Sequence, residues 1–214
     1  MTGRFISTFR LTFGLLMLAT IAYQAAWLWG SPGFKLLNLF SYFSVLSSLL
    51  GCGTLLLTSI TMWQPGGARW DWLRGAATVY VVYGGIVHVA FQDGPAAAGH
   101  TAPPEIAVIL HVVMPVTMLL DWLLDPPNPP MTWKQVLGWM CTPAPYVVYT
   151  LVRGALVDWY PHPLLDPSSG TGLAGTAIAL GGGASMGAIL AVGVAVSGNA
   201  VSNRRKHRRP SSVS

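Results

Sequence analysis

Three polar side chains within the apolar part of the sequence have the chemistry of a catalytic site: Ser44, His88 and His111. A serine hydroxyl is a weak nucleophile until a neighbouring base takes its proton, and imidazole is the usual base because its pKa lies near neutral pH. A serine–histidine pair could therefore attack the carbonyl carbon of an ester. In the competing interpretation the polar groups are structural, with each histidine bonding between helices and Ser44 bonding to a carbonyl of its own helix.

Long apolar segments must position these residues. A membrane-spanning helix needs roughly 20 apolar residues, and six such runs are present, at 8–29, 36–62, 75–91, 106–124, 135–152 and 171–197. Only 9% of the residues are charged, against about 25% in soluble proteins. We predict an all-α membrane protein, a six-helix bundle forming one domain over residues 1–203 with a tail at 204–214.

The distribution of lysine and arginine indicates the orientation, because these residues gather in cytoplasmic loops. Ten of the twelve lie in the two tails and in the second and fourth predicted loops. We therefore predict cytoplasmic N and C termini. At 1.5 Å per residue, Ser44, His111 and His88 then lie about 12, 8 and 5 Å from the outer ends of their helices. All three fall at a similar height in the outer leaflet, where they could share one cleft.

The C-terminal tail is basic and follows directly after the last apolar run. Its cations are Arg204, Arg205, Lys206, Arg208 and Arg209. A short basic segment next to a membrane span fixes the orientation and attracts anionic lipid headgroups. We predict lipid headgroups as its partners, and not nucleic acid.

The longest predicted loop, residues 153–170, carries an arginine, acidic residues and a histidine among aromatic residues. In one interpretation Arg153 forms a salt bridge with Asp158 or Asp166 and holds the loop together. In the other, the loop is a lid over the outer cleft, in which Arg153 binds a carboxylate or a phosphate.

Two further polar features favour structural roles. Asp121 follows His111 by ten residues, which puts it roughly 15 Å away along a helix. That distance is too long for it to orient the imidazole, and we predict that Asp121 pairs locally at the inner interface or with a lysine such as Lys134. The segment from Gly183 to Gly187 fits the GxSxG pattern of serine hydrolases, but that pattern requires a strand-to-helix turn. On an apolar helix, glycines four residues apart favour close helix packing.

Several motifs resemble one family of membrane proteins, in order and over nearly the whole chain. They are NLFSYFSVLSS at 38–48, LHVVMP at 110–115, LDW at 120–122, RG at 153–154 and DWYPHPLLD at 158–166. Together they resemble the Pr6Pr family of bacterial membrane proteins, which implies a location in the bacterial plasma membrane. That family is similar, more distantly, to the FAR-17a/AIG1-like androgen-induced and androgen-dependent hydrolases of animals. Those proteins cleave fatty-acid esters of hydroxy fatty acids with an intramembrane threonine and histidine.

The resemblance implies roles for particular residues. The threonine position falls on Ser44, which keeps the hydroxyl, and the histidine falls on His111. Ser48 stands where bacterial relatives commonly have asparagine, so this chain lacks an amide that could orient the site or donate to an oxyanion. The candidates for substrate binding are His88, Arg153, Asn38 and Tyr42, of which His88 takes no role from the resemblance and either orients the substrate or is structural. No metal ion or organic cofactor is implied.

We therefore expect a membrane-embedded hydrolase that cleaves a lipid-like, fatty acyl ester with Ser44 and His111 in the outer leaflet. The alternative is a carrier or binding protein for an amphiphilic molecule, with the histidines as proton-linked ligands. The two hypotheses differ in geometry. A hydrolase needs the Ser44 hydroxyl within hydrogen-bond reach of a His111 nitrogen, directly or through one water, whereas a carrier does not.

Overall fold

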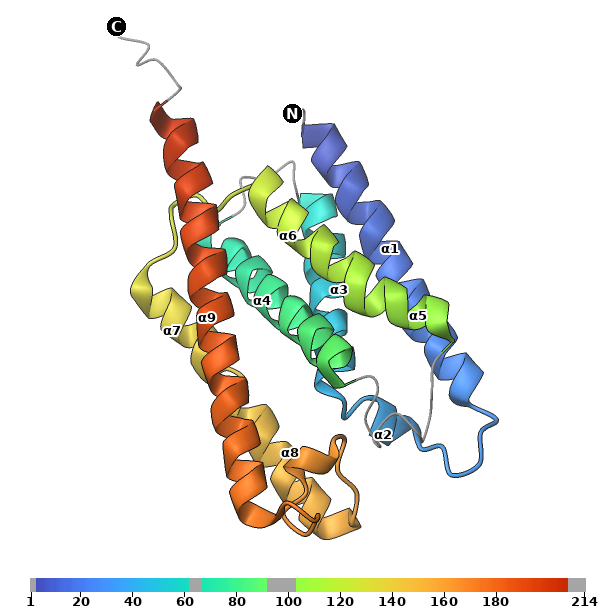
Figure 1. Cartoon of the computed structure of the whole chain (residues 1–214). Coiled ribbons are helices and arrows are strands. Elements are labelled where there is room, and N and C mark those ends of the chain that lie inside the picture. Colours follow the sequence, from blue (N-terminus) through green and yellow to red (C-terminus); the bar gives the residue numbers. More distant parts are fainter. Residues whose placement is uncertain (1–2, 62–66, 92–102, 208–214) are drawn as a thin grey trace, which may run out of the picture.

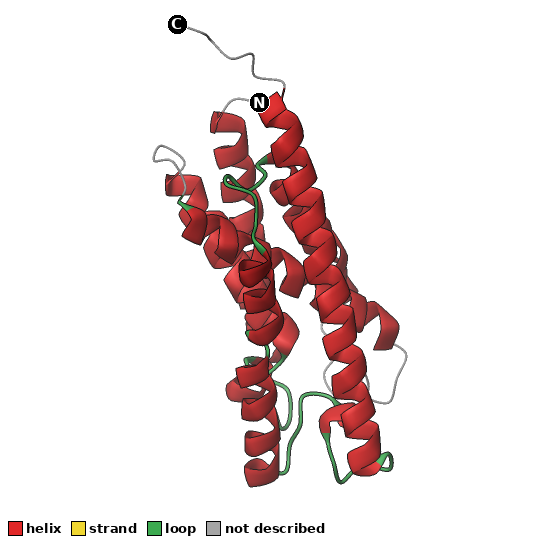
Figure 2. Cartoon of the chain, turned by 90° about the vertical axis from the view of Figure 1, so that its left-hand side faces the viewer, coloured by secondary structure: helices red, strands yellow, loops and turns green. Residues whose placement is uncertain are grey.

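The computed structural model describes residues 3–61, 67–91 and 103–207, and in these ranges the chain forms helices and no strand (Figures 1 and 2). The elements in chain order are α1 (Gly3–Leu28), α2 (Leu36–Leu39), α3 (Phe43–Thr61), α4 (Ala68–Phe91), α5 (Pro104–Val108), a π-helical turn (Ile109–Val113), α6 (Met114–Leu124), α7 (Trp133–Cys141), α8 (Ala144–Val157), a 3-10 turn (Pro163–Leu165) and α9 (Gly172–His207).

Five helical segments of the described chain are long and apolar enough to cross a membrane. They are α1, α3, α4, the continuous segment from α5 through α6, and α9. Large apolar side chains cover their outer surfaces, as in Ile60 of α3 and Ile178 of α9, which are 72% and 75% exposed. Such a surface suits a lipid environment, and the all-helical class expected from the sequence is confirmed.

The predicted helix at 36–62 is broken. The short α2 ends at Leu39, and α3 begins only at Phe43. The hydroxyl of Ser41 is 2.7 Å from the carbonyl oxygen of Leu37 and 2.8 Å from the hydroxyl of Tyr149 on α8. A contact with a distant helix therefore holds the turn between α2 and α3.

The predicted helix at 135–152 is also divided, into α7 and α8. The break falls at Thr142 and Pro143, because proline has no N–H to donate and its ring clashes with the preceding turn. A capping box between Thr132 and Gln135 starts α7. The two side chains accept hydrogen bonds from backbone N–H groups that have no partner within the helix. Neither half is long enough to cross a membrane alone.

Two ends of the bundle can be distinguished in Figure 1. The first residues of α1 and the last residues of α9 lie at one end, which we call the proximal end. The opposite, distal end holds α2, the start of α5 and the end of α8. Near the proximal end, Asn199 of α9 exchanges two hydrogen bonds with the backbone of Met131, at 2.7 and 2.9 Å. The α7–α8 pair therefore carries the chain from the proximal to the distal end.

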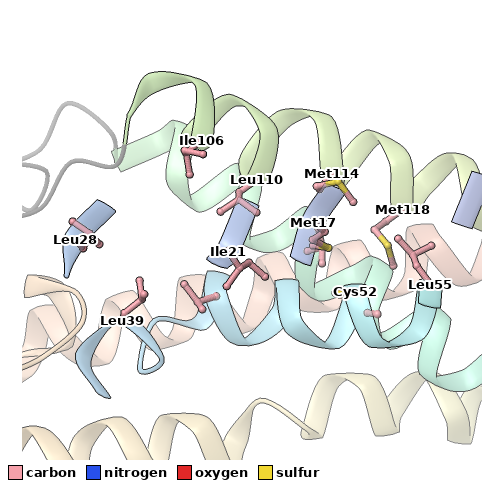
Figure 3. Packing of buried hydrophobic residues seen from close by; sticks show 13 residues of the cluster. Met17, Ile21, Leu28, Leu39, Cys52, Leu55, Ile106, Leu110, Met114 and Met118 are labelled. Carbon is pink, nitrogen blue, oxygen red and sulfur yellow. The ribbon is translucent and has the colours of Figure 1, made fainter. Parts of the chain in front are cut away.

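Helix α4 contacts α3, α6, α7 and α9 and joins the two buried apolar clusters. One cluster lies between α1, α3 and the α5–α6 segment, and Figure 3 shows its side chains meeting there. Its members include Met17, Ile21, Cys52, Leu55, Leu110, Met114 and Met118. The other cluster joins α4, α6, α7 and α9 and contains Trp122 and Trp139. Together these clusters hold α3, α4 and the α5–α6 segment in fixed relation.

A buried network of charges ties the proximal half together. Asp121 of α6, 2% exposed, accepts from Arg10 of α1 at 2.6 Å and from Arg74 of α4 at 2.9 Å. Arg10 also bonds Asp125, and Arg74 also bonds Asp71. Of the two alternatives predicted for Asp121, pairing with a lysine such as Lys134 is wrong, because its partners are the two arginines. Both arginines lie inside helices and not in the flanking loops. Their burial is tolerated because the attraction between the cations and the buried carboxylate offsets the cost of desolvating them.

The two glycines predicted to pack helices in α9 differ in their surroundings. A Cβ on Gly183 would lie 2.6 Å from the hydroxyl oxygen of Tyr83 on α4, so this glycine allows the close approach that was predicted. A Cβ on Gly187 would meet nothing within 4 Å, and the packing role predicted for it is wrong. A second close approach occurs at Gly198, which lies against the indole of Trp122. Gly183 and Gly187 also line the cavity described next.

Candidate functional site

A cavity of about 1670 Å³ lies in the distal half of the bundle. Its wall is mainly apolar and comes from most of the helices, including α1, α3, α4, α8 and α9. Pockets for drug-sized ligands measure about 300–1,000 Å³, so this space suits a larger amphiphilic molecule. The polar side chains in the wall include Gln24, Asn38, Tyr42, Ser44, His88 and His111.

Ser44 lies in the first turn of α3, because the helix is broken just before it. Helix α4 approaches it closely at Gly84, where a Cβ would lie 3.4 Å from the Cα and 3.5 Å from the Cβ of Ser44. The first N–H groups of a helix have no acceptor within the helix, and their partial positive charge favours an anion. Within the described part of the chain, neither the hydroxyl nor the N–H of Ser44 donates a hydrogen bond. Both groups are therefore available to a ligand.

His111 lies in the π-helical turn between α5 and α6, a feature that recurs at functional sites. Gly85 of α4 makes room for this turn, since a Cβ there would lie 2.6 Å from the carbonyl oxygen of His111. The Nδ1 atom of His111 lies 3.1 Å from the carbonyl oxygen of Ala107. A carbonyl oxygen only accepts, so we assign the proton to Nδ1. In the neutral ring, Nε2 then carries the lone pair that a general base needs.

His88 stacks on His111, with ring centroids 3.7 Å apart and planes inclined by 12°. His88 follows Gly84 by four residues, so it lies on the face of α4 that meets Ser44. Like charges at so short a distance repel, and protonation of one ring therefore disfavours protonation of the other. The sequence reasoning offered His88 as a substrate-binding candidate, and the structure puts it beside the candidate base.

Ser44 and His111 contact neighbouring glycines of α4 and line the same cavity. They do not lie on opposite sides of the bundle, the arrangement that would have excluded a pair. Among the described residues, however, no hydrogen bond joins the two side chains directly. One bridging water would suffice for proton transfer between them. That Ser44 and His111 act together as nucleophile and base stays a prediction.

Gln24 of α1 is a polar residue of the cavity wall that the sequence reasoning missed. It lies between Ile21 and Leu28, which belong to the core cluster formed with Leu110 and its neighbours. Its Oε1 atom is buried without a hydrogen-bond partner. A glutamine inside an apolar membrane span is costly, so its presence in the sequence could have marked it as a candidate site residue. Its side-chain amide is the group that relatives with asparagine at the Ser48 position have and this chain lacks there.

The four residues predicted to bind substrate do not all line the cavity. Asn38, Tyr42 and His88 do, whereas Arg153 faces a separate groove beside α8. Arg153 nevertheless reaches the cavity wall, because its Nη2 donates to Asn38 Oδ1 at 2.6 Å. The structure thus joins Arg153 and Asn38, which are 115 positions apart in the sequence.

The segment after α8 folds back over the distal end of the cavity. Asp158 ends the helix in the left-handed region, with φ at 52°, and the ring of Tyr160 then packs against Gly154. The Nδ1 atom of His162 accepts from the N–H of Leu164 at 3.2 Å, and burial lowers the pKa of His162. The segment contributes residues 159–165 to the cavity wall, the position that the predicted lid requires.

Comparison of the chain with models of known protein families, with curated proteins and with solved structures finds no match. The chemistry of the site must therefore be judged from its geometry. In the described residues, no group of three or more His, Cys, Asp or Glu side chains is arranged to hold a metal ion. The site offers a hydroxyl at a helix N-terminus, an imidazole with an available nitrogen and a large apolar space.

Proposed function

We propose that the protein is a membrane-embedded hydrolase of a lipid-like, fatty acyl ester. The main support is that Ser44, at the start of α3, and His111, with an available Nε2, line the same amphiphilic cavity. This proposal includes membership of the Pr6Pr family, which rests on the sequence motifs.

The reaction would proceed through an acyl-enzyme. His111 Nε2 takes the hydroxyl proton while Ser44 Oγ bonds to the ester carbonyl carbon, and the oxyanion is stabilised by the available N–H of Ser44 at the start of α3. The carbon–oxygen bond to the alcohol then breaks, and His111 returns the proton to the leaving oxygen. Water, activated by the same imidazole, hydrolyses the acyl-serine and releases the fatty acid. The acyl chain occupies the apolar cavity, with Asn38, Tyr42 and His88 around the polar end of the substrate.

We further propose six membrane crossings with both termini in the cytoplasm of a bacterial cell. The divided pair α7–α8 serves as the fifth crossing, and the ends of α1 and α9 lie together at the proximal end. The basic tail then lies at the inner surface, where anionic headgroups attract it. A cysteine introduced next to Arg204 should resist an impermeant thiol reagent in intact cells and react after lysis. Labelling in intact cells would overturn this orientation.

The decisive experiment labels the purified protein with a lipophilic fluorophosphonate, which reacts with activated serines. Labelling and ester turnover should be lost in Ser44→Ala and in His111→Ala, and the double variant should lose little more, because a unit fails when either part is removed. Ser44→Thr should retain measurable activity. Ser185→Ala is the matched control, since Ser185 is an exposed serine that bonds only to the carbonyl of Gly181. Equal labelling of wild-type protein and Ser44→Ala would exclude this mechanism.

One observation favours a second candidate, a carrier or binding protein for an amphiphile. Within the described residues Ser44 and His111 form no direct hydrogen bond, and a stacked histidine pair suits proton-linked binding. This candidate predicts retention of a photoreactive fatty acid by both wild type and Ser44→Ala. It also predicts no ester turnover by either protein.

A further inference from the structure

The charge of Arg153 has no acidic partner in the described part of the chain. Neither of the two carboxylates expected to pair with it does so. Asp158 is exposed at the end of α8 and forms no ion pair with a described residue, and Asp166 accepts from the N–H and the hydroxyl of Ser168. The predicted salt bridge between Arg153 and either aspartate is therefore wrong.

The guanidinium group of Arg153 is nevertheless held in place. Its Nη2 donates to Asn38, its central carbon lies 5.0 Å from the ring of Trp159, and its Nε is buried without a hydrogen-bond partner. A cation withdrawn from water without a counter-ion is costly. Neither a neutral amide nor an indole ring supplies the missing negative charge. An anion from outside the protein would compensate it.

The surface beside Arg153 indicates what carries that anion. An open groove of about 780 Å³, lined by residues of α8 alone, runs along one face of this helix from Ala144 to Val157, about 20 Å at the rise of a helix. The groove is apolar apart from Tyr149 and Arg153, and Arg153 lies toward its distal end. A long apolar track with one cation near its end matches an acyl chain attached to an anionic headgroup.

We propose that this groove binds one membrane phospholipid with an anionic headgroup. The phosphate pairs with Arg153, and an acyl chain lies along α8 against Val148, Val152 and Leu156. The site is separate from the cavity that holds Ser44 and His111, and it does not depend on the proposed hydrolysis. The bond between Arg153 and Asn38 connects the bound headgroup to the cavity wall.

The test measures lipid binding to the full chain purified in a neutral detergent, by titration with phosphatidylglycerol and with phosphatidylcholine. Phosphatidylglycerol should bind more tightly, and Arg153→Gln should weaken it about tenfold, as expected for loss of a charge-assisted contact. Arg69→Gln removes the same charge from an exposed position at the start of α4, and it is the matched control. It should change the affinity less than twofold.

Asn38→Asp provides a second variant that retains Arg153. A carboxylate at this position gives the guanidinium an internal counter-ion, so phosphatidylglycerol should again bind about tenfold more weakly. This variant decides the outcome if Arg153→Gln does not fold. Unchanged binding in Asn38→Asp, equal affinity for the two lipids or an equal loss in Arg69→Gln would each overturn the proposal. Displacement of the lipid by millimolar inorganic phosphate alone would also overturn it, since the site would then recognise a free anion.

Discussion

The close approach of α4 to the π-helical turn can be tested at two adjacent glycines. A Cβ on Gly85 would lie 2.6 Å from the carbonyl oxygen of His111 and 2.8 Å from the Cγ of Pro115. A Cβ on Gly84 would make only ordinary contacts, at 3.4 and 3.5 Å from Ser44. Gly85→Ala and Gly84→Ala are thus nearly the same chemical change, and only the first forces a neighbouring backbone to move.

The expected magnitudes follow from these distances. Alanine is favoured over glycine within a helix by about 1 kcal/mol, whereas overpacking costs about 1–3 kcal/mol. We expect Gly84→Ala to be neutral or more stable than wild type and Gly85→Ala to be about 1 kcal/mol less stable. Relief of the clash requires a shift of about 1 Å to reach normal contact distance. A shift of that size in a catalytic group lowers turnover by about 100-fold.

The assay combines thermal unfolding in detergent with fluorophosphonate labelling of both variants. The reasoning predicts reduced labelling in Gly85→Ala, with Gly84→Ala within a few-fold of wild type. If the two variants unfold at the same temperature and label equally, the position of His111 does not depend on Gly85. The geometric account of the site would then be wrong.

Two further predictions concern the ends of the bundle. Asp121→Asn should lower the free energy of unfolding by about 3–5 kcal/mol, because Arg10 and Arg74 lose their shared carboxylate. Lys134→Gln, on an exposed residue, should change it by less than about 0.5 kcal/mol, and similar losses in both would contradict the network. Burial of His162 against the cavity lowers its pKa, so segment 159–165 binds protons more readily when it is displaced from the cavity than when it is packed over it. The packed form should be fully stable above a pH of about 6.5 and should lose stability as the pH falls through the lowered pKa, which would appear as faster amide exchange in the segment. Exchange that does not depend on pH, after correction for intrinsic rates, would refute this.

Hydropathy located the helices but not their breaks. Nothing in Phe40, Ser41 and Tyr42 interrupts the apolar run at 36–62, so the sequence favours one continuous helix. The break depends on hydrogen bonds to Tyr146 and Tyr149, which lie more than 100 positions away. Its effect on the candidate site is large, because it moves Ser44 from the middle of a helix to a helix N-terminus.

Charged residues were the hardest to place from the sequence. Counting lysine and arginine treats Arg10 and Arg74 as flanking residues, whereas both are buried against Asp121. Their partnership depends on the packing of three helices, which no local pattern reveals. The candidate pair of Ser44 and His111 was found more readily, because a hydroxyl and an imidazole in apolar helices stand out. Whether they act together depends on a distance that periodicity cannot supply.

The anchoring of α9 is uneven along its length. Its proximal half is fixed by Asn199 and by a hydrogen bond of 2.8 Å from the Trp122 indole to the carbonyl of Val194. Its distal half exposes Leu173 and Ile178 and forms one wall of the cavity. The distal half is still attached, since it contacts the 3-10 turn and buries Thr176. If these contacts opened, this half could move outward while the hydrogen bonds of the proximal half stayed intact. Lipid would then enter the cavity sideways from the bilayer, at a rate set by the opening of the distal contacts.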